Sequence, residues 1–292
     1  MRQPATDARA CDTRAAVIPL RDANPTRRTP VLTLGLIAVN VVVFVLWQPT
    51  LRGGPQAELD QQLFFFCQGV VPFEVVEQTS LAQGGVTAAQ ALDEDFGPTA
   101  GGPIQQLLGL ECPGKSWLLS VLVAMFLHGG WLHLGGNMLF LWVFGNNIED
   151  RLGYVLFMPF YLAGGVAATA LQVAIDANST VPNVGASGAI AAVLGAYIVL
   201  YPRARVTSLL MLFIFIQVIE VPAIVVLGLW FVLQVFTGVG GLGAGVNGGV
   251  AYFAHIGGFV FGAVVAWLFL RGRRTEEPPY SDPYAPPRPD WM

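Results

Sequence analysis

The chain alternates between long apolar runs and short polar connections, a pattern typical of a polytopic helical membrane protein. Between Thr207 and Leu270 the only acidic, basic or histidine side chains are Glu220 and His255. Backbone in hydrocarbon must satisfy its own hydrogen bonds, so each run is expected to form a helix. Six spans are predicted, at 31–48, 131–148, 154–175, 185–201, 219–237 and 251–270. Residues 207–218 are predicted to be an interfacial segment, with Pro222 opening the fifth helix.

The composition favours a membrane protein over a soluble one. The 292 residues are 54% hydrophobic and 12% charged, which is about half the charged fraction of an average soluble domain. The expected fold class is therefore an all-α membrane protein, a bundle of six transmembrane helices in a lipid bilayer. The chain has no basic patch with interleaved aromatic residues, so nucleic acid is not an expected partner.

The distribution of basic residues predicts the orientation of the bundle. The long first loop, 49–116, contains only Arg52 and Lys115 among many acidic residues, and the connections near 176–184 and 238–250 contain no lysine or arginine. The positive-inside rule therefore predicts that both termini are cytoplasmic, and we expect a multi-pass protein of the plasma membrane. The arginines placed on the cytoplasmic side are Arg27, Arg28, Arg151, Arg203, Arg205, Arg271, Arg273 and Arg274.

Three regions are predicted along the chain: a polar, irregular N-terminal tail over 1–30, a membrane domain over 31–270 and a Pro-rich tail over 271–292. The first apolar run is expected to remain as a signal anchor, because no small-residue cleavage site follows it. The loop 49–116 is expected to hold an interfacial helix pair and a flexible insertion at 82–106. Cys67 and Cys112 either pair or remain free thiols, and no zinc spacing is present, so no metal is expected.

All three histidines, His128, His133 and His255, lie in or beside predicted spans. Ionisable groups are costly at this depth, which makes each a functional candidate. The alternative is that each ring is satisfied by a backbone carbonyl.

The sequence places three reactive groups at one depth. Ser187, His255 and His133 each lie 16 residues before a charged residue that marks the end of the span. At 1.5 Å per residue, all three side chains lie about 24 Å above that end. In a hydrocarbon core of about 30 Å they share one level, a little below the outer surface.

Stripes of small residues allow two of these helices to approach closely. His255, Gly258 and Gly262 share one face of the sixth span, and Ser187 begins a comparable stripe on the fourth. Small faces let membrane helices pack closely, so the Ser187 hydroxyl is expected to reach His255, which then acts as general base. The fourth and sixth spans contain no Asp or Glu, so the site would be a dyad. The alternative is that Gly185 to Gly188 form only a packing surface.

His133 and Asn137 are four residues apart on the second span and therefore share a face. Side-chain donors of this kind, with the Ser187 backbone N–H, stabilise the oxyanion of a tetrahedral intermediate. From the sequence it is equally possible that these side chains form an interhelical hydrogen bond that only holds the bundle together. His128 is expected in a loop that supports the site.

The order of these motifs resembles the rhomboid family over about 126–270. The resemblance implies a six-helix core with Ser187 as nucleophile, His255 as base, and His133 and Asn137 as oxyanion donors. It further implies a site open to outside water, transmembrane proteins as substrates, and no metal or organic cofactor. The motifs are HGGWLHLGGN from His128 to Asn137, EDRLG from Glu149 to Gly153, GASG from Gly185 to Gly188, and AHIGG from Ala254 to Gly258 with Gly262.

The chain departs from the family pattern in three places. Some members have a Trp-Arg pair in the first loop, whereas Trp117 here has no neighbouring arginine. Some have an aromatic residue one turn after the serine, where this chain has Ala191. The sequence therefore does not identify the group that orients His255. The first-loop insertion matches nothing in the pattern. An inactive relative that binds membrane clients and a transporter are the competing interpretations. The natural substrate and the oligomeric state do not follow from the sequence.

Overall fold

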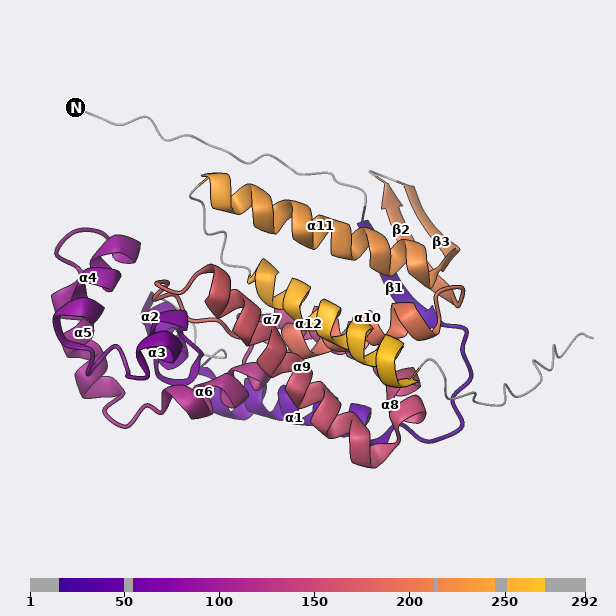
Figure 1. Cartoon of the computed structure of the whole chain (residues 1–292), viewed down its shortest axis with the longest axis horizontal. Helices are drawn as coiled ribbons and strands as arrows, with labels where there is room; N and C mark the ends of the chain where they lie inside the picture. The colour runs from indigo at the N-terminus through magenta and orange to yellow at the C-terminus, as the bar shows by residue number, and fades with distance from the viewer. Residues whose placement is uncertain (1–15, 50–54, 213–214, 245–250, 271–292) are drawn as a thin grey trace, which may run out of the picture.

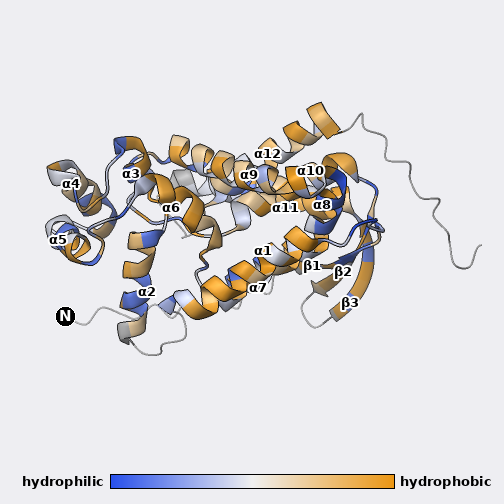
Figure 2. Cartoon of the chain, turned by 90° about the horizontal axis from the view of Figure 1, so that it is seen from below, coloured by the Kyte–Doolittle hydropathy of each residue, from blue (hydrophilic) through white to orange (hydrophobic). Residues whose placement is uncertain are grey.

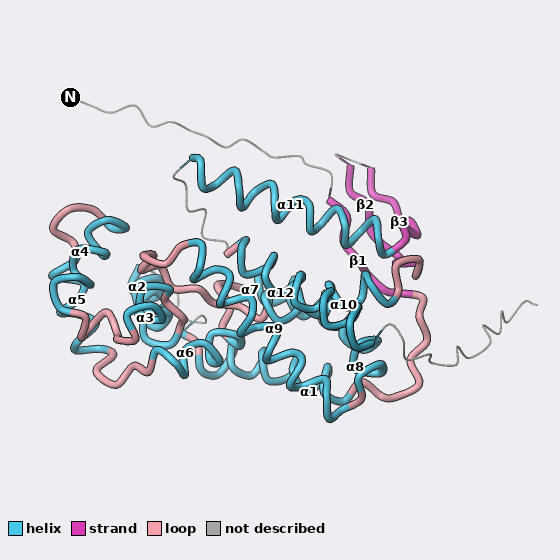
Figure 3. Tube along the Cα trace, in the orientation of Figure 1, coloured by secondary structure: helices cyan, strands magenta, loops and turns pink. Residues whose placement is uncertain are grey.

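The structure is a computed structural model that describes residues 16–49, 55–212, 215–244 and 251–270. Helices dominate, with a small helical cap at one end of a helix bundle and a three-stranded sheet at the other (Figures 1 and 3). The helices of the bundle are α1 (Val31–Val42), α6 (Trp117–Val123), α7 (Trp131–Phe140), α8 (Asn146–Leu152), α9 (Tyr154–Ile175), α10 (Ser187–Leu200), α11 (Ala223–Ala244) and α12 (Tyr252–Val265). Single π-helical turns follow α1, α7 and α12, at Val43–Trp47, Leu141–Gly145 and Ala266–Leu270, and a 3₁₀ turn at Ala124–Phe126 follows α6.

Only some of the predicted spans meet the length and composition of a membrane helix on their own. Among the described residues three stretches do: Tyr154–Ile175, Ala223–Gly241 and Tyr252–Leu270. The pair Trp117–Phe126 and Trp131–Leu152 does so only when the two helices are taken together, and it is bent by 79°. The helices between the cap and the sheet are mainly hydrophobic (Figure 2). The six-helix count and the orientation of the termini remain predictions.

Helix α10 is short because protein, not lipid, surrounds it. Every residue from Gly188 to Tyr197 is buried, and α9 and α12 pack against it. A helix enclosed in this way does not have to match the thickness of a bilayer.

The sequence prediction of an all-α fold is wrong at the end of the bundle away from the small helical cap, where three strands form a sheet (Figure 1). The predicted interfacial segment forms an antiparallel hairpin of β2 (Arg205–Leu212) and β3 (Phe215–Pro222), and β1 (Ala16–Asp22), from the predicted irregular tail, pairs with β2. Val206 and Ser208 on β2 are fully buried. A short apolar run rich in β-branched residues fits a strand as well as a helix, and periodicity alone does not separate them. The predicted tail 271–292 lies outside the described residues.

The first loop forms a small cap with its own core, not a flexible insertion. We define the cap as residues 55–112, which contain α2 (Pro55–Gln68), α3 (Pro72–Glu77), α4 (Gly85–Phe96) and α5 (Gly101–Glu111). Its core includes Val71, Leu81 and Leu92. Cys67 and Cys112 are joined by a disulfide, which settles the alternative left open by the sequence.

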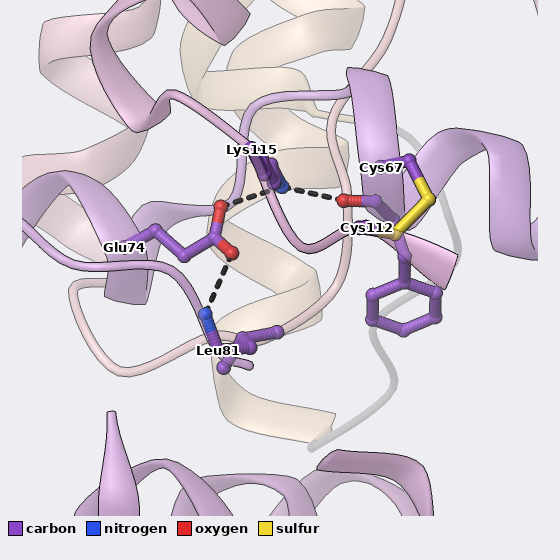
Figure 4. Close-up of a disulfide and its surroundings, with 6 residues drawn as sticks. Cys67, Glu74, Leu81, Cys112 and Lys115 are labelled. Carbon is purple, nitrogen blue, oxygen red and sulfur yellow. Dashed lines mark hydrogen bonds and ion pairs between the residues drawn. A yellow bond between two sulfur atoms is a disulfide. The ribbon is translucent and has the colours of Figure 1, made fainter. Parts of the chain in front are cut away.

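A buried ion pair lies beside this disulfide (Figure 4). The Lys115 ammonium contacts the Glu74 carboxylate, and both side chains are almost completely buried. The other carboxylate oxygen accepts the Leu81 N–H at 2.8 Å. Burial raises the pKa of Glu74 and lowers the pKa of Lys115, and the charge of each partner opposes that shift. The pair ties the cap to the start of α6.

Helices α10 and α12 cross in direct backbone contact. A β-carbon added to Gly258 would overlap the Gly188 carbonyl, one added to Gly262 would overlap the Ala192 carbonyl, and one added to Gly195 would overlap the Phe259 carbonyl. The predicted close approach of these two helices is therefore confirmed, and it depends on the missing side chains.

Gly262→Ala is predicted to lower the thermal unfolding temperature in detergent, because the new methyl group forces α12 away from the Ala192 backbone. The cost is expected at about 1–3 kcal/mol, typical of overpacking. Gly228→Ala on α11 is the matched control, since a β-carbon there meets no atom within 4 Å. Equal unfolding temperatures for the two variants would contradict the close crossing.

Replacing both cap cysteines, Cys67→Ser with Cys112→Ser, is predicted to lower the free energy of cap opening by about 2–4 kcal/mol. The disulfide closes a loop with a sequence separation of 45 residues, which restricts the unfolded chain. Pulse proteolysis in urea measures the change. Cys11→Ser, outside the described residues, is the control. If the double variant resists proteolysis in urea as well as the unaltered chain does, the disulfide does not stabilise the cap.

Candidate active site

Ser187 and His255 are in hydrogen-bond contact. Ser187 is the first residue of α10, and His255 lies in the first turn of α12. The Ser187 hydroxyl oxygen is 2.7 Å from the Nε2 atom of His255. Both residues are half-buried, so the pair lies inside the bundle but is not sealed from solvent.

Helix α11 provides the second partner of the histidine. The Nδ1 atom of His255 is 2.7 Å from the Oε1 atom of Gln234. The Trp230 ring lies beside the imidazole, with centroids 5.8 Å apart and planes inclined by 37°. The sequence did not identify either residue, although Gln234 is a polar side chain in an apolar span, which is itself a signal of function.

Gly185 allows His133 to approach the serine. Its φ of 136° is a backbone conformation that side chains other than glycine rarely adopt. A β-carbon there would lie 3.0 Å from the His133 Nε2 atom and 3.4 Å from the Ser187 hydroxyl oxygen. The His133 ring and the serine hydroxyl therefore flank the same small space.

His133 and Asn137, the two oxyanion donors predicted on α7, have different surroundings. The His133 Nδ1 atom accepts the Gly129 N–H at 3.2 Å, which leaves the proton of the neutral ring on Nε2, the nitrogen beside Gly185. Asn137 is buried, and its Nδ2 atom has no hydrogen-bond partner within the part of the chain that the structure describes. A buried amide donor without a partner is costly, so Asn137 is suited to a ligand that supplies an acceptor.

His128 occupies a loop position, as the sequence predicted. Its backbone N–H donates to the Gln48 Oε1 atom at 3.0 Å, and its carbonyl accepts from Gln48 Nε2 at 2.9 Å. Its fully buried ring packs edge-on against His133, with centroids 5.2 Å apart. The ring of His128 therefore supports His133 by packing against it.

The cap fixes the connection that leads to Ser187. Val70 and Asn183 exchange backbone hydrogen bonds of 3.2 and 2.7 Å. Thr180 donates from its backbone and its hydroxyl to the Asp95 carboxylate at 2.7 and 2.6 Å. A pocket of about 40 Å³ beside Ser187 includes Val70 in its wall, and this volume is enough for a water molecule.

A hydrogen-bonded serine and histidine inside an apolar helix bundle have the form expected of a membrane-embedded serine hydrolase. A family model described as the Rhomboid domain matches residues 115–272. The match covers more than half of the 292 residues, so the chain belongs to the rhomboid family.

Curated relatives support the same assignment over part of their lengths. "Rhomboid protein 1, mitochondrial" of Saccharomyces cerevisiae is 30% identical over 52% of this chain and 42% of its own length. "Presenilin-associated rhomboid-like protein, mitochondrial" of Bos taurus is 30% identical over 49% and 36%. "Rhomboid-like protein 11, chloroplastic" of Arabidopsis thaliana is 28% identical over 51% of each. The chain thus matches between about a third and a half of these relatives.

These names contradict the predicted plasma-membrane location. The relatives whose names give a compartment are mitochondrial or chloroplastic, and none of these names gives the plasma membrane. The prediction is wrong because hydropathy and basic residues identify spans and their orientation, but not which membrane contains them.

Proposed function

We propose that this chain is an intramembrane serine endopeptidase that cleaves transmembrane segments of other membrane proteins through a Ser187–His255 dyad. The observation that carries the proposal is the 2.7 Å contact between the Ser187 hydroxyl and His255 Nε2. A serine hydroxyl is a weak nucleophile unless a neighbouring base accepts its proton. An inactive relative that only binds membrane clients would not need this contact.

In the proposed reaction the Ser187 oxygen attacks the substrate carbonyl carbon while His255 Nε2 takes the hydroxyl proton. The tetrahedral intermediate collapses when the peptide C–N bond breaks and His255 returns that proton to the leaving amine. Water then attacks the acyl-serine ester, with His255 again accepting and returning a proton. The two products are a carboxylic acid and an amine, so the cycle consumes one water and no other reactant.

The oxyanion of the intermediate would be held by three donors. The Ser187 backbone N–H lies in the first turn of α10, where N–H groups have no partner within the helix. The other two donors, His133 Nε2–H and the Asn137 Nδ2 amide, are carried by α7. The Asn137 amide is buried without a partner among the described residues, which favours a role as oxyanion donor over a structural hydrogen bond. Gly185, Gly188, Gly258 and Gly262 support the site by allowing the close approaches described above.

The position of the site supports cleavage near the outer membrane face, and the surface of α11 supports entry of the substrate from the bilayer. The site lies at the cap end of α10 and α12, and the disulfide of the cap indicates an oxidising compartment on that side. Helix α11, beside the site, exposes Leu233 and Phe236, as expected for contact with lipid. A substrate that is itself embedded in the bilayer reaches the site from that direction.

We predict that a fluorophosphonate probe labels the purified protein in detergent and that Ser187→Ala abolishes labelling, because the probe reacts with an activated serine. His255→Ala is expected to slow labelling by about 100-fold or more through loss of the base. Labelling is measured by in-gel fluorescence. Ser120→Ala on α6 is the control and should label normally. Undiminished labelling of Ser187→Ala would place the nucleophile elsewhere.

His133→Ala and Asn137→Ala are each predicted to reduce kcat for a model transmembrane substrate by about 100- to 1000-fold, because each removes one oxyanion donor. The measurement is the steady-state rate of cleavage in proteoliposomes, with thermal unfolding alongside. Asn178→Ala, an exposed loop residue, is the control. If both variants cleave at the full rate, the two side chains have only a structural role.

A further inference from the structure

His255 is held from two sides by residues of one helix. Gln234 and Trp230 are four residues apart on α11 and therefore share a face. The amide oxygen of Gln234 contacts Nδ1 at 2.7 Å, and the Trp230 ring lies next to the imidazole plane. The position one turn after Ser187 is Ala191, which is too small to orient the ring.

The contact with Gln234 fixes which nitrogen of His255 carries the proton. A carbonyl oxygen only accepts hydrogen bonds, so Nδ1 of His255 is the donor and carries a hydrogen. In the neutral ring, Nε2 then has the free lone pair, and Nε2 is the atom 2.7 Å from the Ser187 hydroxyl. The opposite tautomer would put a hydrogen on Nε2 and prevent the ring from accepting the serine proton.

We propose that Gln234 is the positioning residue of His255, in the place that a carboxylate takes in a serine–histidine–aspartate triad. The inference rests on the proposed function, because orientation of His255 matters only if His255 serves as the base. No proton passes to Gln234. Its oxygen accepts from Nδ1–H in the neutral imidazole and continues to accept in the imidazolium that forms when Nε2 takes the serine proton.

A neutral amide suits this location better than a carboxylate. Gln234 lies in an apolar helix whose neighbours Val232, Leu233 and Phe236 are exposed on the outside of the bundle. An ionised side chain at such a site carries a large desolvation cost, and a glutamine supplies the same acceptor geometry without a charge. Within the described residues the Gln234 amide forms its hydrogen bond with this ring, which gives a polar side chain in an apolar helix a partner.

Three variants separate positioning from simple packing. Gln234→Leu removes the acceptor while keeping a similar volume, and Gln234→Glu keeps an oxygen at the same place in either protonation state. Thr237→Val, one turn along α11 and exposed, is the matched control. The readouts are the rate of fluorophosphonate labelling of Ser187, kcat and KM for a model transmembrane substrate, and the thermal unfolding temperature.

We expect Gln234→Leu to slow labelling and lower kcat by about 10- to 100-fold. This is less than the roughly 100- to 10,000-fold that a general base contributes, because His255 remains and loses only its orientation. KM and the unfolding temperature should stay near those of the unaltered chain. Gln234→Glu should recover most of the lost rate, and Thr237→Val should match the unaltered chain.

Normal labelling in Gln234→Leu would overturn the inference. The inference would also be overturned if Gln234→Leu lowered the rate and the thermal unfolding temperature together and Gln234→Glu did not recover the rate. That pattern would mean that Gln234 only holds α11 against α12. Failure of the proposed function has a different signature, since the unaltered chain would then show no labelling that depends on Ser187.

Discussion

The structure depends on the contact between the backbones of α10 and α12. Membrane helices have no hydrophobic drive to associate with each other in lipid, so they associate where small residues permit close packing. Gly188 and Gly258 provide such a place near the cap, and Gly262 meets Ala192 one turn further along. This crossing brings the first residue of α10 to the first turn of α12, which is where Ser187 and His255 lie. A larger side chain at these positions would separate the two groups.

The cap adds a second constraint on the same site. Its hydrogen bonds to Asn183 and Thr180 fix the connection from α9 to α10, and Gly185 donates its N–H to the Ala124 carbonyl at 2.9 Å. The disulfide and the buried pair of Glu74 and Lys115 make the cap rigid enough to serve as this support. The long first loop is therefore part of the structure that holds Ser187, although the family match begins only at residue 115.

Local pattern predicted the long apolar helices well, and it predicted the sheet and the helices of the cap poorly. The span predicted at 154–175 matches α9 at both ends, because hydrophobic length is a local property. The hairpin of β2 and β3 was missed because a short apolar run fits a strand as well as a helix. The strand β1 was missed because it pairs with a segment far along the chain, as in the partners Val17 and Leu210. Pairing over such a distance leaves no local signal in either strand.

The same distinction applies to the site. Ser187, His255 and His133 were found because each is a reactive group at a matched distance from a charged helix end. Gln234 was missed because its contact with His255 depends on the rotation of α11 against α12, which only packing determines. Ala191 indicated that another group must orient His255, without indicating the helix that provides it.

The most direct test is a crystal structure of the protein after reaction with a fluorophosphonate. We predict a bond from the Ser187 hydroxyl oxygen to phosphorus, with the phosphonyl oxygen within hydrogen-bond distance of His133 Nε2 and Asn137 Nδ2. His255 should remain in contact with Gln234. An adduct on another residue, or a phosphonyl oxygen that points away from α7, would contradict the account.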